Sequence, residues 1–167
     1  MIGWLLDTNV IAEIIRAGGS TRVKAWAASQ DEATLYLSIL TIGEYDKGIT
    51  NLPDDDPRRT AFMASRDNLA ARFGPRLLSV SDPIIRRWGA ISGTVKRDTG
   101  HPPPVIDTML AATALEHGLI LATRNLRDVR LSGAALFDPW NDDPAGVLKT
   151  LPGRGPARRS RLRPPSP

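Results

Sequence analysis

The sequence contains no cysteine, and only two of its 167 residues are histidine. A disulfide framework and a thiolate metal site are therefore excluded. No apolar run approaches the ~20 residues that a membrane-spanning helix needs. Residues 1–4 (MIGW) lead directly into an apolar segment, without the charged leader of a secretory signal. Because no targeting segment is recognisable, we expect a cytoplasmic protein.

The positive charge of the chain is concentrated at one end. The formal net charge is +4, but residues 150–167 carry five arginines and no acid, among prolines and glycines. Residues 1–149 hold 17 lysines and arginines against 18 acids. We therefore expect one folded, slightly acidic domain over residues 1–149 and a basic, disordered tail over residues 150–167. The tail is either a solvated extension or an arm that adds electrostatic affinity for a nucleic acid.

Short apolar runs alternate with stretches of helical periodicity along the chain. Strands are expected at residues 4–6, 35–38, 77–78, 119–122 and 135–137. Helices are expected at about residues 10–15, 20–29, 41–48, 58–73, 82–96 and 105–117. Buried strands that alternate with helices form a mostly parallel sheet with helices on both faces. The sequence therefore predicts a single α/β domain.

Three acids lie where a predicted strand ends or a predicted helix begins. Asp7 follows the first strand, Glu44 lies in the helix expected to start at Thr41, and Asp107 lies just after a triple proline. Each acid also has a purely structural explanation. Asp7 can cap a helix, and Thr41 and Glu44 match a capping box. The helix dipole favours an acid in the first turn, where Asp107 lies. However, ligands bind outside the carboxyl ends of the strands in open α/β sheets. The three acids are therefore expected to converge at that edge.

Converging carboxylates repel one another unless a cation neutralises them. Hard oxygen ligands, in a chain without cysteine, favour Mg²⁺ or Mn²⁺ over zinc. A divalent ion of this kind can lower the pKa of bound water and hold a phosphodiester for attack. The pattern predicts a divalent-metal site at Asp7, Glu44 and Asp107.

Four segments, in this order, resemble the motifs of PIN domains, specifically of the VapC and FitB toxins of bacterial toxin–antitoxin pairs. They are residues 5–11 (LLDTNVI), 38–44 (SILTIGE), 104–119 (PVIDTMLAATALEHGL) and 122–128 (ATRNLRD). Residues 137–140 (FDPW) are similar to the usual ending of the FitB-like branch. The resemblance implies a PIN-like three-layer α/β/α fold and Mg²⁺- or Mn²⁺-dependent cleavage of RNA. It also implies a homodimer and inhibition by a small antitoxin, through which alone the protein would reach DNA.

The resemblance also implies roles for individual residues. Asp7, Glu44 and Asp107 would be the metal ligands, and Asn125 stands where many PIN domains carry a fourth acid. An amide is a neutral oxygen ligand at best, so a second metal would be held less strongly. Supporting roles fall to Thr8, Thr123 and Asp128. Thr123 would bond a carboxylate or merely cap the next turn, and Asp128 would either compensate for Asn125 or be a surface acid.

Two other functions fit parts of the pattern. The missing fourth acid is compatible with a non-catalytic subunit that works with its antitoxin on operator DNA. A phosphatase-like hydrolase would use Asp7 as its nucleophile. Such enzymes usually pair that residue with a second Asp two positions later, and here Asn9 occupies the position. The phosphatase interpretation is therefore the weakest of the three.

Overall fold

The computed structural model of the chain describes residues 2–144. The predicted domain end at residue 149 and the predicted tail over residues 150–167 lie outside the described residues and stay predictions. Among residues 2–144, none of the helices combines the length and the apolar character needed to cross a membrane.

The centre of the fold is a sheet of five parallel strands in the order β3-β2-β1-β4-β5. The strands are β1 (Trp4–Leu6), β2 (Leu35–Ser38), β3 (Leu77–Leu78), β4 (Ile120–Ala122) and β5 (Leu136–Phe137). Leu6 pairs with Leu37 on one side and with Ala122 on the other, so the strands end at the same edge. The predicted parallel α/β sheet is confirmed.

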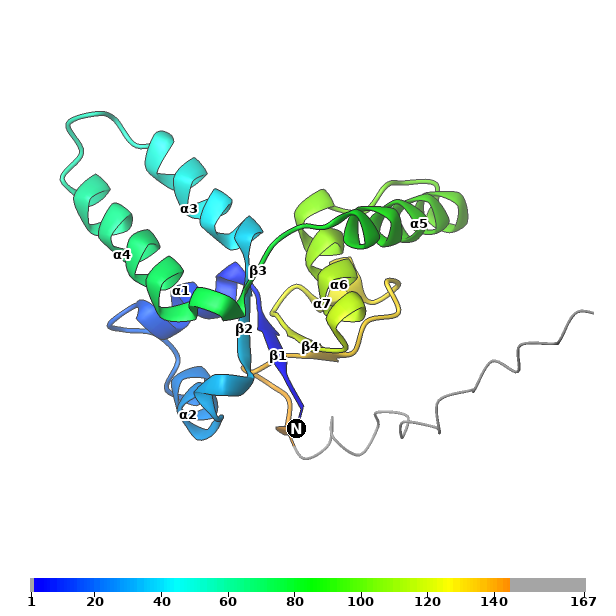
Figure 1. The fold of residues 1–167 in the computed structure, drawn as a ribbon, viewed down its shortest axis with the longest axis horizontal. Helices are drawn as coiled ribbons and strands as arrows, with labels where there is room; N and C mark the ends of the chain where they lie inside the picture. The colour runs from blue at the N-terminus through cyan, green and yellow to red at the C-terminus, as the bar shows by residue number, and fades with distance from the viewer. Residues whose placement is uncertain (1, 145–167) are drawn as a thin grey trace, which may run out of the picture.

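Seven helices and two 3-10 turns connect the strands in the described part of the chain. They are α1 (Thr8–Ile15), α2 (Thr21–Ser29), η1 (Glu32–Thr34), α3 (Ile39–Thr50), α4 (Arg58–Phe73), η2 (Gly74–Arg76), α5 (Asp82–Thr99), α6 (Val105–His117) and α7 (Leu126–Val129). Figure 1 shows α3 and α4 side by side as one long hairpin, and α5 packed along α6 in a second pair. Helix α5 runs three residues beyond its predicted end at Lys96 and stops at Gly100, whose φ of 80° is left-handed.

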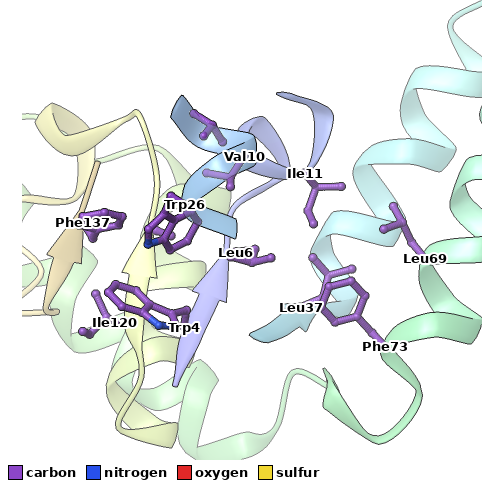
Figure 2. Packing of buried hydrophobic residues seen from close by; sticks show 12 residues of the cluster. Trp4, Leu6, Val10, Ile11, Trp26, Leu37, Leu69, Phe73, Ile120 and Phe137 are labelled. Atoms are coloured by element: carbon purple, nitrogen blue, oxygen red, sulfur yellow. The ribbon is translucent and has the colours of Figure 1, made fainter. Parts of the chain in front are cut away.

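Hydrophobic side chains fill both faces of the sheet. Strand β1 alternates, so that Trp4 and Leu6 point to one face and Leu5 to the other. The first face packs against α1, α2 and α4, and the second against α6. Figure 2 shows the aromatic part of the first core, where the rings of Trp4, Trp26 and Phe137 lie 5.0–5.3 Å apart between centroids. The three-layer α/β/α arrangement is confirmed.

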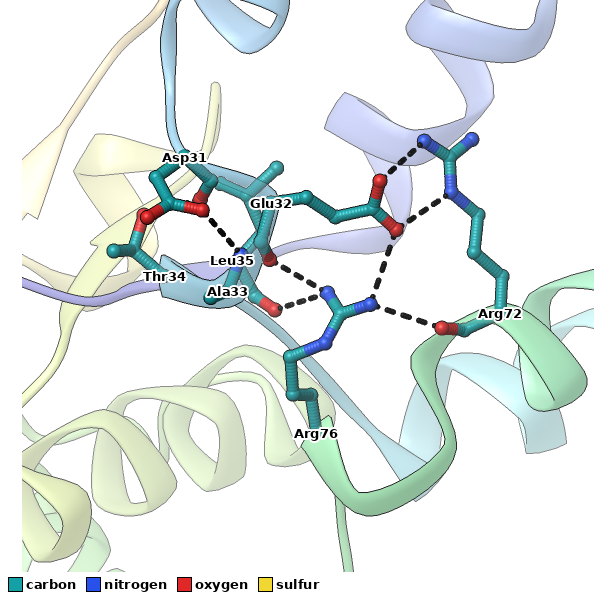
Figure 3. Close-up of polar contacts among 7 residues, drawn as sticks. All are labelled: Asp31, Glu32, Ala33, Thr34, Leu35, Arg72 and Arg76. Carbon is teal, nitrogen blue, oxygen red and sulfur yellow. Dashed lines mark hydrogen bonds and ion pairs between the residues drawn. The ribbon is translucent and has the colours of Figure 1, made fainter.

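A polar network ties the entry of β2 to the end of α4 (Figure 3). The guanidinium of Arg76 donates to the backbone carbonyls of Glu32, Leu35 and Arg72 at 2.8–2.9 Å. It also bonds the Glu32 carboxylate at 3.1 Å, which Arg72 reaches from α4 at 3.1–3.2 Å. The side chain of Arg76 is 19% exposed and that of Arg72 is 69% exposed. Arg76 is therefore the residue that bonds three backbone carbonyls at this junction, of which the Leu35 contact is partly buried.

Candidate functional site

The residues that follow β1, β4 and β5 lie next to one another at the carboxyl edge of the sheet. The backbone N–H of Asp7 donates to the carbonyl of Ala122 at 3.0 Å, and that of Thr123 donates to Phe137 at 2.9 Å. The polar residues Asp7, Thr123 and Asp138 are all buried there. Polar side chains are rarely buried without a partner, so each contact at this edge carries information.

The carboxylate of Asp7 faces the loop after β4 and does not cap α1. Asp7 occupies the N-cap position of α1, yet its side chain accepts no capping hydrogen bond from that helix. Its Oδ2 instead accepts from the hydroxyl of Thr123 at 2.6 Å and from the amide of Asn9 at 2.7 Å. Helix capping therefore does not explain an acid at this position.

The pKa of Asp7 is raised above its ordinary value. Burial is the main cause, and the hydrogen bond from Thr123 opposes it. The negative charges of Asp107 and Glu44 raise the pKa further. Asp107 and Glu44 therefore lie near enough to Asp7 for their charges to act on its carboxylate.

Asp107 is linked to Asp7 through two residues of the loop after β4. The side-chain amide of Asn125 donates to Asp107 Oδ1 at 3.2 Å. The backbone N–H of Asn125 donates to the Thr123 hydroxyl at 2.9 Å, and that hydroxyl in turn donates to Asp7. A continuous hydrogen-bonded path thus joins the first turn of α6 to the end of β1.

Glu44 reaches the same edge from the second turn of α3, and the capping-box interpretation of its role was wrong. Helix α3 begins at Ile39, because Ser38 caps it by accepting from the N–H of Leu40 at 3.2 Å. Thr41 is fully buried inside the helix, where its hydroxyl lies 3.1 Å from that of Thr8. Oε2 of Glu44 accepts a hydrogen bond from the Thr8 hydroxyl. The carboxylate is therefore directed to the start of α1 and away from its own helix end.

Asp128 lies apart from this arrangement. It is exposed on α7 and lines a cleft of about 270 Å³ together with Thr99 and residues 101–104. Asp7, Glu44 and Asp107 do not line that cleft. A compensating role for Asp128 stays a prediction.

Asn9 is a site residue that the sequence did not single out. Its amide donates to Asp7 and, at 3.3 Å, to the hydroxyl of Thr123, and its Oδ1 accepts from the N–H of Arg124 at 3.4 Å. In the sequence, Asn9 stood out only as a capping residue and as the absent second aspartate. Its position two residues after Asp7, within the same motif, was the available signal.

Comparison with known proteins identifies the family. The family model described as the PIN domain matches residues 4–133, which include all three acids and Asn125. This chain is a PIN-domain protein. The toxin FitB of Neisseria gonorrhoeae is 31% identical over 138 residues, which cover 83% of this chain and 99% of FitB. The VapC ribonuclease Y4jK of Sinorhizobium fredii is 33% identical over 141 residues, which cover 81% and 96% of the two chains. The predicted VapC/FitB membership is confirmed.

Solved structures agree with this assignment. A chain in the structure of FitAB bound to an IR36 DNA fragment superposes with a TM-score of 0.74 at 29% identity, covering 84% of this chain and 97% of that one. A chain in the structure of FitAcB from Neisseria gonorrhoeae gives a TM-score of 0.72 at 30% identity, covering 83% and 99%.

The acids of this PIN domain are not assembled into a metal centre as they stand. Among residues 2–144, no three Asp, Glu, His or Cys side chains lie close enough together to hold one ion. Each of the three acids is directed to a polar neighbour, Asp7 to Thr123, Glu44 to Thr8 and Asp107 to Asn125. The donor set itself, three carboxylates with hydroxyl and amide oxygens nearby, fits Mg²⁺ or Mn²⁺.

Proposed function

We propose that this PIN domain is a Mg²⁺- or Mn²⁺-dependent ribonuclease and the toxin of a toxin–antitoxin pair. The observation that carries the proposal is the buried carboxylate of Asp7, which is linked to Asp107 through Thr123 and Asn125 and feels the charge of Glu44. A buried acid whose pKa is raised by burial and by neighbouring negative charges is typical of sites that bind cations or carry out proton chemistry. The names of the relatives, a toxin and a VapC ribonuclease, support the same function.

Asp7, Glu44 and Asp107 would hold the ion. Asp7 already has a fixed orientation, and Glu44 and Asp107 would exchange their contacts with Thr8 and Asn125 for the metal. When bound, the ion would lower the pKa of a coordinated water and draw charge from the scissile phosphate. Asn125 would offer only a neutral oxygen, which would hold a second ion weakly. We therefore propose that the site binds one ion.

The neighbouring residues position the ligands. Thr123 and Asn9 both donate to the same oxygen of Asp7, Oδ2, which fixes the rotation of the carboxylate. The Thr8 hydroxyl does the same for Glu44 from the adjacent turn of α1. We assign Thr8, Asn9 and Thr123 as positioning residues for this reason.

The proposed substrate is RNA, and the proposed partners are a small antitoxin and a second copy of the chain. FitAB and FitAcB are complexes, and FitAB is bound to DNA. DNA contact would accordingly be made through the antitoxin.

Cleavage of a mixed RNA pool by the purified protein tests the proposal. The wild-type chain is expected to cut RNA with Mg²⁺ or Mn²⁺ and to stop when EDTA removes the metal. Asp107→Ala is expected to be inactive with an unchanged circular-dichroism spectrum. Asp98, an exposed acid on α5, offers a matched control, since Asp98→Ala should retain most of the activity. Metal-dependent cleavage that survives in Asp107→Ala would refute the assignment.

One observation favours a second candidate function. Asn125 stands where many PIN domains carry an acid, which fits a non-catalytic subunit that acts with its antitoxin on operator DNA. Folded, antitoxin-free protein that cuts no RNA with either metal, yet strengthens operator binding by its antitoxin, would favour this function over the first.

A further inference from the structure

A cleft of about 330 Å³ adjoins the candidate site on the side of the α3–α4 hairpin. Its lining comes from α1, α3, α4 and the loop between α3 and α4, and consists of Thr8, Ala12, Glu44, Tyr45, Gly48, Leu52, Arg58 and Phe62. Two of these residues, Thr8 and Glu44, belong to the candidate site. The cleft therefore adjoins Glu44, and most of its lining comes from the α3–α4 hairpin that Figure 1 shows.

Two of the residues that line the cleft are aromatic. Phe62 is 43% exposed on α4, although it faces an opening beside a polar site, and Tyr45 is half-buried on α3. Ala12 and Leu52 add apolar lining, and Gly48 contributes no side chain. Aromatic rings beside a groove of this kind form a surface on which an unpaired nucleobase stacks.

One residue of the lining is a cation. Arg58 lines the cleft, and Asp56 fixes its guanidinium in a two-pronged ion pair with contacts of 2.7–3.2 Å. A fixed guanidinium can stack on a base or contact a phosphate oxygen. Glu44, in contrast, is negatively charged and repels a phosphate that no cation accompanies. The chemistry of the lining therefore favours a nucleobase beside the aromatic rings over a second phosphate. The volume of the cleft lies at the lower end of the range of ligand pockets.

We propose that this cleft is a nucleobase subsite, in which Tyr45 and Phe62 hold the unpaired base of a nucleotide adjoining the scissile phosphate of single-stranded RNA. The inference rests on the proposed ribonuclease function for the identity of the ligand as RNA. It extends substrate binding from Glu44 on α3 along the hairpin to Phe62 on α4.

RNA binding, measured apart from cleavage, tests the subsite. A fluorescein-labelled, single-stranded RNA of mixed sequence is titrated with protein in the non-cleaving Asp107→Asn background with Mg²⁺, and anisotropy is recorded. Adding Phe62→Ala is expected to raise Kd about 5- to 150-fold, the range for losing a stacked base. Met63→Ala is the matched control, because Met63 is the next residue of α4, is 42% exposed and does not line the cleft. It should change Kd less than twofold.

A second pair of variants fills the cleft without removing any contact. An added Cβ at Gly48 or at Gly43 meets no atom within 4 Å, and both glycines are exposed on α3. Only Gly48 lines the cleft. Gly48→Leu is expected to weaken RNA binding at least fivefold, whereas Gly43→Leu should leave it unchanged. The melting temperature of both variants should be no lower than that of the parent, because leucine has a higher helix propensity than glycine.

Photocrosslinking locates the base directly. RNA containing 4-thiouridine is expected to crosslink to Tyr45 or Phe62, as identified by mass spectrometry of the digested protein. Crosslinks confined to other residues, or an unchanged Kd in both Phe62→Ala and Gly48→Leu, would overturn the subsite. Variants that alter the oligomeric state in gel filtration but not RNA affinity would also overturn it and would mark the cleft as a protein contact. If wild-type protein binds RNA through Phe62 but never cuts it, the proposed ribonuclease function fails and the subsite stands.

Discussion

Among the three acids of the candidate site, Asp7 is the one whose ionised form most destabilises the folded protein. Its carboxylate is buried, and its pKa is raised by burial and by the charges of Asp107 and Glu44. In the metal-free protein the ionised form of Asp7 is therefore more favourable in the unfolded chain than in the folded one. The buried, ionised carboxylate of Asp7 therefore lowers the stability of the metal-free protein at the place where a cation would be bound.

Asp7→Asn is expected to raise the melting temperature of the metal-free protein at pH 7–8. A raised folded-state pKa means that the folded state binds the proton more tightly than the unfolded chain. The cost of ionised Asp7 is therefore fully present above the folded-state pKa and is relieved as the pH falls through that value. The advantage of Asp7→Asn should shrink on acidification, with a shift of about 2–4 °C for each kcal/mol relieved in a chain of this size.

Differential scanning calorimetry in EDTA between pH 4 and pH 8 measures this difference. Asp128→Asn, which removes an exposed acid, is the control and should show no such pH dependence. A variant that is less stable than wild type at every pH would contradict the electrostatic account of Asp7.

Thr123 offers a test of positioning at the same scale. Its hydroxyl donates to Asp7 and accepts from the N–H of Asn125. Thr123→Val, of similar shape, is expected to lower metal-dependent RNA cleavage about 10- to 100-fold, the usual effect of losing a contact that orients a metal ligand. Thr123→Ser keeps the hydroxyl and should restore most of the rate. Equal losses in both variants would mean that Thr123 acts through its packing alone.

The sequence allowed the acids to be predicted more readily than their contacts. Asp7, Glu44 and Asp107 stand at chain positions that a parallel sheet brings together, so the pattern of strand ends was sufficient. The hydrogen bond from Asn9 to Asp7 could not be predicted, because a side-chain amide at that position can bond to helix backbone groups, to water or to other side chains. The choice depends on where β4 places Thr123, which is a property of the tertiary fold.

At the scale of elements, most boundaries agree with the sequence, and the differences have local causes. Helix α3 begins at Ile39 and not at Thr41, since Ser38 is already extended at the end of β2 and its hydroxyl can cap the helix. Helix α7, with four residues, is too short to show a hydrophobic period and was not predicted. Capping residues compete over one or two positions, so sequence alone leaves this margin.

The Arg76 network predicts unequal effects for two arginines that bind the same glutamate. Arg76→Met is expected to destabilise the protein by about 1–3 kcal/mol, because it removes three carbonyl contacts and leaves the partly buried carbonyl of Leu35 without this donor. Arg72→Met removes only an exposed ion pair and should cost about 0–1 kcal/mol. Urea unfolding of both variants measures the difference, and equal costs would show that the carbonyl contacts of Arg76 contribute little.

At the scale of the whole molecule, the sequence predicts a folded domain over residues 1–149 and a basic tail over residues 150–167. The buried hydrophobic side chains of the described core extend from Trp4 to Phe137, and five arginines lie in residues 150–167. The division itself stays a prediction.

A chain that ends at residue 149 is therefore expected to unfold at the same temperature as the full chain, within about 1–2 °C. It should also keep metal-dependent RNA cleavage, since the three acids and Asn125 are retained. Thermal unfolding and RNA cleavage over a range of salt concentrations check both points. A large drop in melting temperature would show that the last 18 residues are part of the fold, and a weaker salt dependence of RNA binding would identify them as an arm for RNA.

Binding of Mn²⁺ to the metal-free protein tests the central claim most directly, because it does not require knowledge of the RNA target. Electron paramagnetic resonance of free Mn²⁺ during titration counts the bound ions in wild type, Asp7→Asn, Asp107→Asn and the control Asp98→Asn, in which an exposed acid of α5 is removed. The account predicts one saturable site in wild type and in Asp98→Asn, with binding weakened about 10-fold or more in the other two variants. Equal Mn²⁺ binding in all four proteins, or none in wild type, would contradict a metal site built on Asp7 and Asp107.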